Sequence, residues 1–250
     1  NAEKELERKL NEEKNNLLYM QRIKEAFGLN KIPKTIEVYD VSHISGEFAV
    51  GAMISFNKDG FIKNNYRKFN IKGEFKRKDI VLKGDDYSMI YEVLNRRLKK
   101  NSKKISFPDL MIIDGGKGHL SSAVQVFLEL GINNIPLASI AKQNEEIFIP
   151  NFSEPVEFSS NSESLSVLQK IRDEAHRFAI NYHRKLRSKA ALFSSIDTIH
   201  GIGPKKRKAI LNKFGSIKNI NKSSIEEITT IPGISKKLAK QLLSISKNMQ

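Results

Sequence analysis

The chain has 250 residues, a length that suits one or two domains. Lysine and arginine total 43 against 28 aspartates and glutamates, and the resulting net charge of +15 favours polyanionic partners. Cysteine is absent, which excludes disulfide scaffolds, thiolate zinc sites and cysteine nucleophiles.

The N-terminal residues, NAEKELERKL, lack the apolar stretch of a signal peptide. No apolar run approaches the roughly 18 residues that cross a bilayer, so we expect a soluble, cytoplasmic protein with no membrane partner. Because the chain begins with Asn1 and not with Met, we also expect a fragment of a longer protein. Apolar residues at mostly helical intervals predict a first helix that stops at Gly28.

After Thr35 the apolar period changes to two, which is typical of strands. In TIEVYDVSH, one face of the predicted strand carries Ile36, Val38 and Asp40. FAVGAMISF alternates in the same way, and YRKFNI predicts a third strand that closes a meander. Burying a carboxylate is costly unless it is paired or bound to a cation, so Asp40 is a candidate ligand.

A basic loop at residues 73–83 precedes DDYSMIYEVLNRRLKK, which predicts a helix with Asp85 or Asp86 as its N-cap. The apolar string LMIID then predicts a buried strand that ends at Asp114. Ligands gather at the carboxyl ends of such strands, so Asp114 and Asp40 could hold a hard divalent cation together. The residues alone leave open that both carboxylates are structural.

GGKG follows that strand at residues 115–118 and leads into a helix from about Leu120 to Leu130. It is not a Walker loop, because Gly118 stands where that motif needs Ser or Thr after Lys117. Lys117 is a candidate contact to a phosphodiester, and a purely structural turn is the alternative.

IPLASIA predicts another strand, and residues 164–189 predict a long helix with an apolar stripe. His176 falls roughly 120° from the centre of that stripe, at the edge of the buried face, with His183 two turns later. Basic residues, including the candidate DNA contacts Arg177 and Arg184, surround the histidines. A solvated basic helix is the alternative. The element order predicts an α/β fold, a mixed sheet with helices on its faces.

SKAALFSS, residues 188–195, predicts a linker between a domain at 1–190 and a second at 196–250. Residues 197–250 carry 11 basic and 3 acidic residues, about half of the surplus charge. This segment contains two copies of one pattern, a glycine-containing hairpin followed by a basic helix. Gly201 and Gly233 occupy equivalent positions in the two copies, 32 residues apart. Helix N-termini suit phosphate oxygens, which favours DNA-backbone binding over a protein-interaction module. The candidate residues are Gly201, Gly203, Lys205, Lys206, Arg207, Gly233, Ser235, Lys236 and Lys237.

Long strings of the chain resemble the C-terminal half of the UvrC family, the incision subunit of bacterial nucleotide excision repair. They include YDVSHISGE, YRKFNI, PDLMIIDGGKGHL, LQKIRDEAHRFAINYHRKLRSK and IHGIGPKKRKAILNKFGSI. The resemblance implies a ribonuclease H-like mixed sheet flanked by helices, followed by a small all-α tandem helix-hairpin-helix domain.

By this resemblance the family's catalytic residues fall on Asp40, Asp114 and His176, which would hold Mg²⁺ or Mn²⁺. Asp173 and Glu174 would be spare carboxylates for an outer contact or a second ion. The implied activity is the 5′ incision at a lesion in double-stranded DNA, in a complex with UvrB. We expect the family's other nuclease and its main UvrB-contacting segment to be absent from this chain.

Two other functions stay open at this point. One is a nuclease of the endonuclease V or ribonuclease H type, against which the tandem hairpins argue. The other is a non-catalytic DNA-binding module.

Overall fold

The structure is a computed structural model that describes residues 2–44, 47–73, 86–99, 106–142, 146–156 and 163–247. Most of the basic loop at 73–83, and Asp85 as a predicted N-cap, lie outside the described residues. The chain divides into two compact units, Asn1–Asn181 and Tyr182–Gln250. Among the described helices, none combines the length and the apolar character that crossing a bilayer requires.

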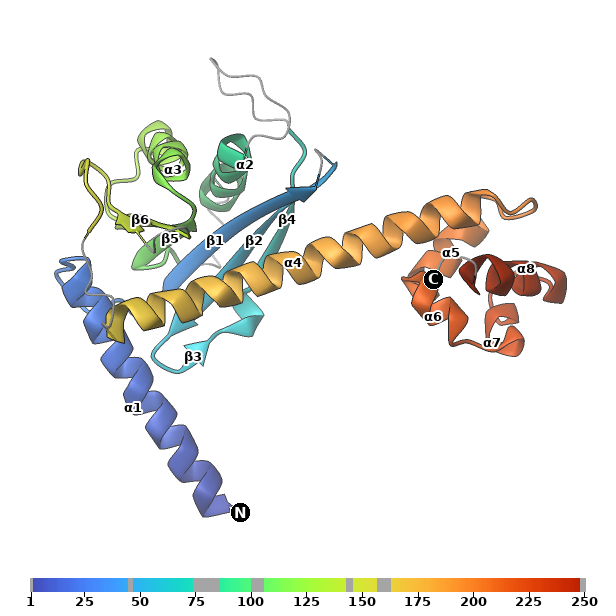
Figure 1. The fold of residues 1–250 in the computed structure, drawn as a ribbon, viewed down its shortest axis with the longest axis horizontal. Coiled ribbons are helices and arrows are strands. Elements are labelled where there is room, and N and C mark those ends of the chain that lie inside the picture. The colour runs from blue at the N-terminus through green and yellow to red at the C-terminus, as the bar shows by residue number, and fades with distance from the viewer. Residues whose placement is uncertain are drawn as a thin grey trace. The chain divides into compact units, whose positions relative to one another are not determined.

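The first unit is built on a seven-stranded mixed sheet with the order β3-β2-β1-β5-β6-β7, in which β4 also pairs with β2 (Figure 1). Its central strands β1, β5 and β6 are parallel, and the remaining pairs are antiparallel. The strands are β1 (Ile36–Ile44), β2 (Glu47–Asn57), β3 (Gly60–Phe61), β4 (Arg67–Asn70), β5 (Leu110–Asp114), β6 (Leu137–Ala141) and β7 (Glu146–Phe148). The predicted mixed sheet is confirmed, and the short strands β3 and β7 were not predicted.

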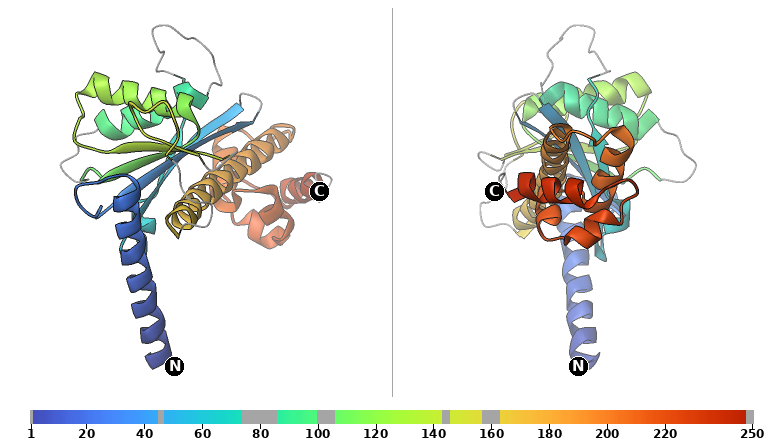
Figure 2. Two further views of the ribbon diagram at one scale, coloured as in Figure 1. Left: turned by 60° about the vertical axis from the view of Figure 1, so that its left-hand side comes forward. Right: turned by 90° about the vertical axis from the view of Figure 1, so that its right-hand side faces the viewer.

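Helices cover both faces of this sheet. They are α1 (Ala2–Ala26), η1 (Lys63–Asn65), α2 (Asp86–Lys99), α3 (Lys117–Leu130) and α4 (Glu163–Asp197). α2 and α3 pack on one face, while α4 and the C-terminal part of α1 pack on the other (Figures 1 and 2). Gly28, just after α1, has φ +58, the left-handed conformation expected of a helix stop.

The alternation of β1 sends its side chains into two separate cores. Ile36 and Val38 enter the core under α4, and Tyr39 enters the core under α2 and α3. On the α2 side the buried Glu37 carboxylate accepts a hydrogen bond of 2.7 Å from Arg97 and a second one from the Tyr39 hydroxyl. Each buried charge therefore has a partner, and β1 is tied to α2.

The second unit contains the end of α4 and four short helices around an isoleucine-rich core. The helices are α5 (Pro204–Phe214), α6 (Ile217–Asn221), α7 (Ile225–Thr229) and α8 (Lys236–Lys247). Two turns have the same backbone bond, from Ile202 N to Ile199 O at 3.2 Å and from Ile234 N to Ile231 O at 3.1 Å. The internal repeat of 32 residues is therefore a structural repeat.

The predicted linker at residues 188–195 is wrong, because α4 continues through it to Asp197. The segment contains no Gly or Pro to stop a helix. Leu192 and Ile196, one helical turn apart, are each 1% exposed in the core of the second unit, and their burial stabilises the extra turns. The division between the two units falls within α4, after Asn181.

Gly51 generates a prediction about the packing of α2. A Cβ atom at this position of β2 would lie 2.4 Å from Cγ2 of Val93 on α2, closer than two carbon atoms can approach. We expect Gly51→Ala to lower the free energy of unfolding by about 1–3 kcal/mol in a denaturant titration, because the core is overpacked.

Val93→Ala removes the clashing methyl groups and provides the matched control. In the double variant we expect a smaller loss than the sum of the two single losses. Additive losses would contradict a direct clash between these two positions.

Candidate metal centre

Asp40 and Asp114 lie abreast on neighbouring parallel strands. The register of β1 and β5 pairs Val38 with Ile112 and Tyr39 with Ile113, so the next pair along the strands is the two aspartates. Both aspartates continue the alternation of residues that face α4. The sheet therefore delivers two carboxylates side by side, one from the middle of β1 and one from the carboxyl end of β5.

α4 brings the third predicted residue to the same place. His176 Nδ1 lies 3.1 Å from Oδ2 of Asp40, and one ligand atom from each of Asp40, Asp114 and His176 lies within 4.8 Å of the others. The Asp40 side chain is 7% exposed, whereas the His176 side chain is 40% exposed. The site is thus buried on the sheet side and open on the histidine side.

The electrostatics of this cluster favour a bound cation or a retained proton. Burial and the neighbouring Asp40 carboxylate raise the pKa of Asp114 to about 7, although Arg172, His176 and Lys142 oppose the rise. The hydrogen bond with Asp40 raises the pKa of His176 against the effect of burial. Two carboxylates and an imidazole are a donor set that suits Mg²⁺ and Mn²⁺, so the residues fit such an ion.

Two cations lie near the cluster: Arg172 was among the basic residues predicted to surround the histidines, and Lys142 was not predicted. Arg172 is 6% exposed and pairs with Asp173 at 3.0 Å, and Lys142 directly follows β6, the strand beside β5. The sequence signal for Lys142 was its place after a predicted apolar strand.

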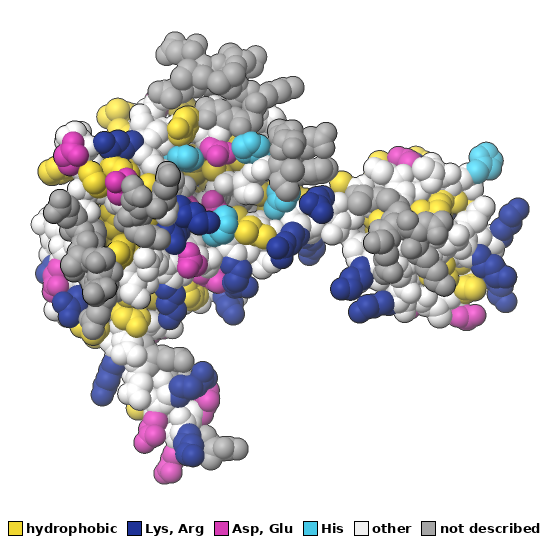
Figure 3. All heavy atoms as spheres, in the orientation of Figure 1, with side chains coloured by type: hydrophobic (Ala, Val, Ile, Leu, Met, Phe, Trp, Pro, Cys, Tyr) yellow, Lys and Arg dark blue, Asp and Glu magenta, His cyan; other side chains and the backbone are white. Residues whose placement is uncertain are grey.

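The spare carboxylates Asp173 and Glu174 lie outside the cluster of ligand atoms among the described residues. Asp173 pairs with Arg172, and Glu174 pairs with Arg177. In the sheet unit, Figure 3 shows histidines and acidic side chains close together, with Lys and Arg side chains beside them.

The glycines of GGKG make room for side chains. A Cβ atom on Gly115, whose φ is +148, would lie 2.4 Å from the His119 ring, and one on Gly118 would lie 2.5 Å from the Tyr87 ring. These two rings pack edge to face with their centroids 4.9 Å apart. Lys117 is exposed, and its Nζ lies 5.2 Å from the centre of the Phe148 ring. The geometry of this turn supports its structural interpretation.

Of the residues predicted to bind DNA in the second unit, some are exposed and others have partners within the chain. Gly201 and Gly233 have φ of +93 and +81, while Gly203 is the N-cap of α5 with φ −80. The hydroxyl of Ser235 accepts a 3.3 Å bond from Leu238 N and so caps the first turn of α8. The lysines at the starts of the two helices are exposed: Lys205, Lys236 and Lys237.

The other two basic residues of the first hairpin have partners within the chain. Lys206 donates a 3.0 Å bond to the carbonyl of Gly201. Arg207 pairs with Asp197, lies 4.6 Å from the centre of the Phe193 ring, and has a side chain only 20% exposed. These two residues therefore brace the hairpin. On α4, Arg177 and Arg184 are both exposed.

Residues 24–180 match the family described as "UvrC RNAse H endonuclease domain", and residues 193–247 match "SAM-like Helix-hairpin-helix tandem". Among curated relatives, the UvrABC system protein C of Wolbachia pipientis subsp. Culex pipiens (strain wPip) is 45% identical over 97% of this chain. The protein of the same name from Dictyoglomus thermophilum is 42% identical over 90%.

The chain spans 40% and 36% of the lengths of these two relatives. Among solved structures, Ciona intestinalis Endonuclease V, in complex with a 24mer DNA containing an inosine, is 19% identical with a TM-score of 0.31. That alignment covers 70% of this chain and 69% of the other. The match to the first family extends over more than half of the chain and agrees with the strings quoted from the sequence, and the chain belongs to the UvrC family.

Proposed function

We propose that this chain is the part of a nucleotide excision repair nuclease that makes the 5′ incision at a lesion. The observation that carries the proposal is the convergence of Asp40, Asp114 and His176, whose ligand atoms lie within 4.8 Å of one another. Membership of the UvrC family supports it, because the matched relatives are named UvrABC system protein C.

Asp40 and Asp114 would hold Mg²⁺ or Mn²⁺ through their carboxylate oxygens, together with His176. When bound, such an ion supplies Lewis-acid polarisation of the scissile phosphate and of the attacking water. Asp40 also orients the imidazole of His176 through the 3.1 Å hydrogen bond. The cationic side chains of Arg172 and Lys142 offset part of the negative charge of the carboxylates.

The second unit would hold double-stranded, damaged DNA by its backbone. Its two hairpins place exposed lysines at the N-termini of α5 and α8, where unpaired N–H groups also favour phosphate oxygens. Contacts of this kind position DNA without reading its sequence. UvrB would be the protein partner that directs the incision to a lesion.

The catalytic proposal predicts the behaviour of three single variants. In a nicking assay on a lesion-containing duplex with UvrA and UvrB, the full-length parent protein should make the 5′ cut. Asp40→Ala, Asp114→Ala and His176→Ala should slow that cut by at least about 100-fold, because each removes a group that supports transition-state charge.

Glu154→Ala, which removes an exposed carboxylate outside the cluster, is the matched control and should cut normally. If the three variants still make the 5′ cut at the parent's rate, the proposed site is wrong. If the unaltered parent binds damaged DNA and never cuts it on the 5′ side, the chain is a binding module.

Metal binding should depend on pH, because Asp114 must lose its proton to become a ligand. Since the pKa of Asp114 is about 7 and the pKa of His176 is also raised, the affinity for Mn²⁺ should fall by more than tenfold per pH unit as the pH drops below both values. It should level off once both groups have lost their protons. Titration followed by Mn²⁺ electron paramagnetic resonance measures the dissociation constant without any turnover.

Asp114→Asn provides the control, because it removes the titrating group. Its weaker Mn²⁺ binding should show a shallower dependence on pH between 5 and 7, where His176 alone still titrates. A wild-type affinity that is constant over this range would contradict a coupled carboxylate pair.

DNA binding by the hairpins predicts a change in salt dependence. Changing Lys205, Lys236 and Lys237 together to Ala should weaken binding to a duplex and lower the slope of log K against log salt by about 2.7. Fluorescence anisotropy at several salt concentrations measures this slope. A matched triple change at the exposed Lys218, Lys222 and Lys240 should leave it nearly unchanged. Equal slopes for both triple variants would show that the hairpins are not part of the DNA-binding surface.

A further inference from the structure

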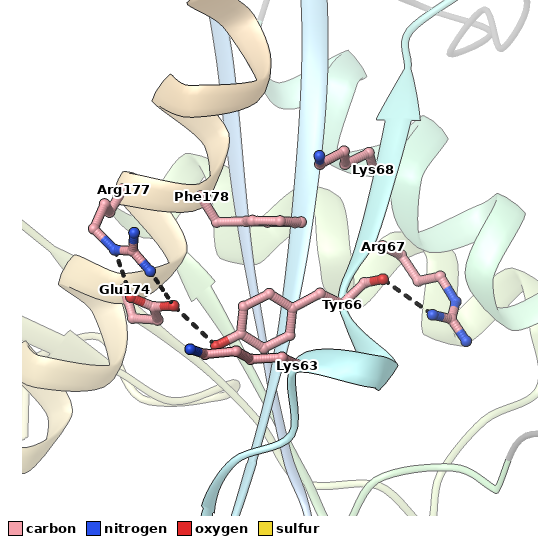
Figure 4. A pocket seen from close by; sticks show the side chains of 7 residues that line it. All are labelled: Lys63, Tyr66, Arg67, Lys68, Glu174, Arg177 and Phe178. Atoms are coloured by element: carbon pink, nitrogen blue, oxygen red, sulfur yellow. Dashed lines mark hydrogen bonds and ion pairs between the residues drawn. The ribbon is translucent and has the colours of Figure 1, made fainter. Parts of the chain in front are cut away.

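A second cationic site lies on the sheet unit, in a pocket between α4 and the segment formed by η1 and β4 (Figure 4). We call it the α4–β4 pocket, and its volume is about 480 Å³. It is lined by Lys63, Tyr66, Arg67, Lys68, Glu174, Arg177 and Phe178. Three of these residues belong to the string YRKFNI, for which the sequence predicted a strand and no site.

The pocket is separate from the candidate metal centre. An α-helix turns by about 100° per residue, so Glu174 and Phe178 lie about 160° around α4 from His176. His176 points toward Asp40, and Glu174 accepts a 3.0 Å hydrogen bond from the hydroxyl of Tyr66. The metal centre and the pocket therefore occupy opposite flanks of one helix.

Among the described residues that line the pocket, the acidic one, Glu174, already has its partners. Both carboxylate oxygens of Glu174 accept hydrogen bonds of 2.7 Å from Arg177, and one of them also accepts a hydrogen bond from the Tyr66 hydroxyl. In Figure 4 this carboxylate lies between Arg177 and Tyr66, with Lys63 and Lys68 at opposite ends of the pocket. Four cations and one carboxylate give these lining residues a net charge of +3, which favours an anionic ligand.

Two aromatic rings form the wall of the pocket. Tyr66 and Phe178 pack edge to face, with centroids 4.9 Å apart and an interplanar angle of 70°. Lys68 Nζ lies 4.9 Å from the centre of the Phe178 ring. Figure 4 shows Phe178 edge-on and Tyr66 face-on, and both rings line the pocket. Phe178 supports the Tyr66 ring from the side.

We propose that the α4–β4 pocket binds single-stranded DNA, with a base stacked on Tyr66 and its phosphates held by Lys63 and Lys68. An aromatic platform beside cations is how proteins hold unpaired strands without reading their sequence. A helix is about 10–12 Å across with its side chains. The nucleotide held in the pocket would therefore lie a few nucleotides away from the one at the metal centre. This inference rests on the proposed function, because it assigns a second contact for the DNA that is cut.

The first test removes the two exposed lysines. We expect Lys63→Ala/Lys68→Ala to weaken binding to a 20-nucleotide single strand and to lower its salt slope by about 1.4, since each lost contact to a single strand contributes about 0.7. The matched control, Lys31→Ala/Lys34→Ala, removes the same charge from exposed positions before β1 and should keep the slope. An unchanged slope in the pocket variant, or a change seen with duplex alone, overturns the proposal.

The second test measures directly whether a base stacks on the side chain at position 66. The chain has no tryptophan, so Tyr66→Trp places a single indole in the pocket, whose emission is distinct from that of the tyrosines. Its fluorescence should be quenched when the single strand binds, because the base stacks on the indole. Phe107→Trp, at an exposed position outside the pocket, should keep its fluorescence. Quenching at both positions or at neither overturns the proposal.

Substitutions at Tyr66 separate stacking from a general loss of structure. Tyr66→Phe keeps the ring and should bind the single strand within about twofold of the parent. Tyr66→Leu keeps an apolar side chain and should bind it about 5- to 150-fold more weakly, which corresponds to the roughly 1–3 kcal/mol that base stacking contributes. Equal binding by these two variants would overturn the proposal that a base stacks on Tyr66.

The pocket and the proposed function can fail separately. If the lysine variant keeps its salt slope while Asp40→Ala loses the 5′ cut, the pocket inference is wrong and the proposed function stands. If the lysine variant binds single strands poorly while Asp40→Ala still cuts, the pocket binds DNA and the proposed metal centre is wrong.

Discussion

The arrangement of the first unit depends on two carboxylates held side by side. Asp40 and Asp114 are abreast because β1 and β5 run parallel in a register that pairs Val38 with Ile112. Burial and the neighbouring Asp40 carboxylate both disfavour the charged form of Asp114, and its pKa rises to about 7. A divalent cation or the imidazole of His176 relieves the repulsion. On the opposite face of β1 a buried ion pair between Glu37 and Arg97 ties the strand to α2 and fixes its position.

The positive charge of the chain is divided among surfaces with different roles. In the second unit, exposed lysines at the starts of α5 and α8 form the proposed grip on duplex phosphates, while Lys206 and Arg207 brace the hairpin. In the first unit, the cations of the α4–β4 pocket face an aromatic wall, a combination suited to an unpaired strand. One side of α4 therefore carries His176 of the candidate metal centre, and the other side lines the pocket.

Local periodicity was enough to predict much of this fold and where the residues of the candidate site lie in it. The alternation of TIEVYDVSH placed Asp40 on the α4 face, and the apolar string before Asp114 placed that residue at a strand end. The helical stripe of α4 put His176 at the edge of the buried face. The α4–β4 pocket could not be predicted, because Tyr66 and Phe178 meet only through tertiary packing. The linker at 188–195 was wrong because Leu192 finds its core in the second unit, which short-range composition does not reveal.

Anomalous diffraction from a crystal soaked in Mn²⁺ tests the metal centre most directly. A peak bounded by the carboxylates of Asp40 and Asp114 and by the imidazole of His176 is the expected result, and it should disappear in a crystal of Asp114→Asn soaked in the same way. A wild-type crystal that shows no peak at this position, with Mn²⁺ bound elsewhere on the chain, would contradict a metal-dependent nuclease site formed by these three residues.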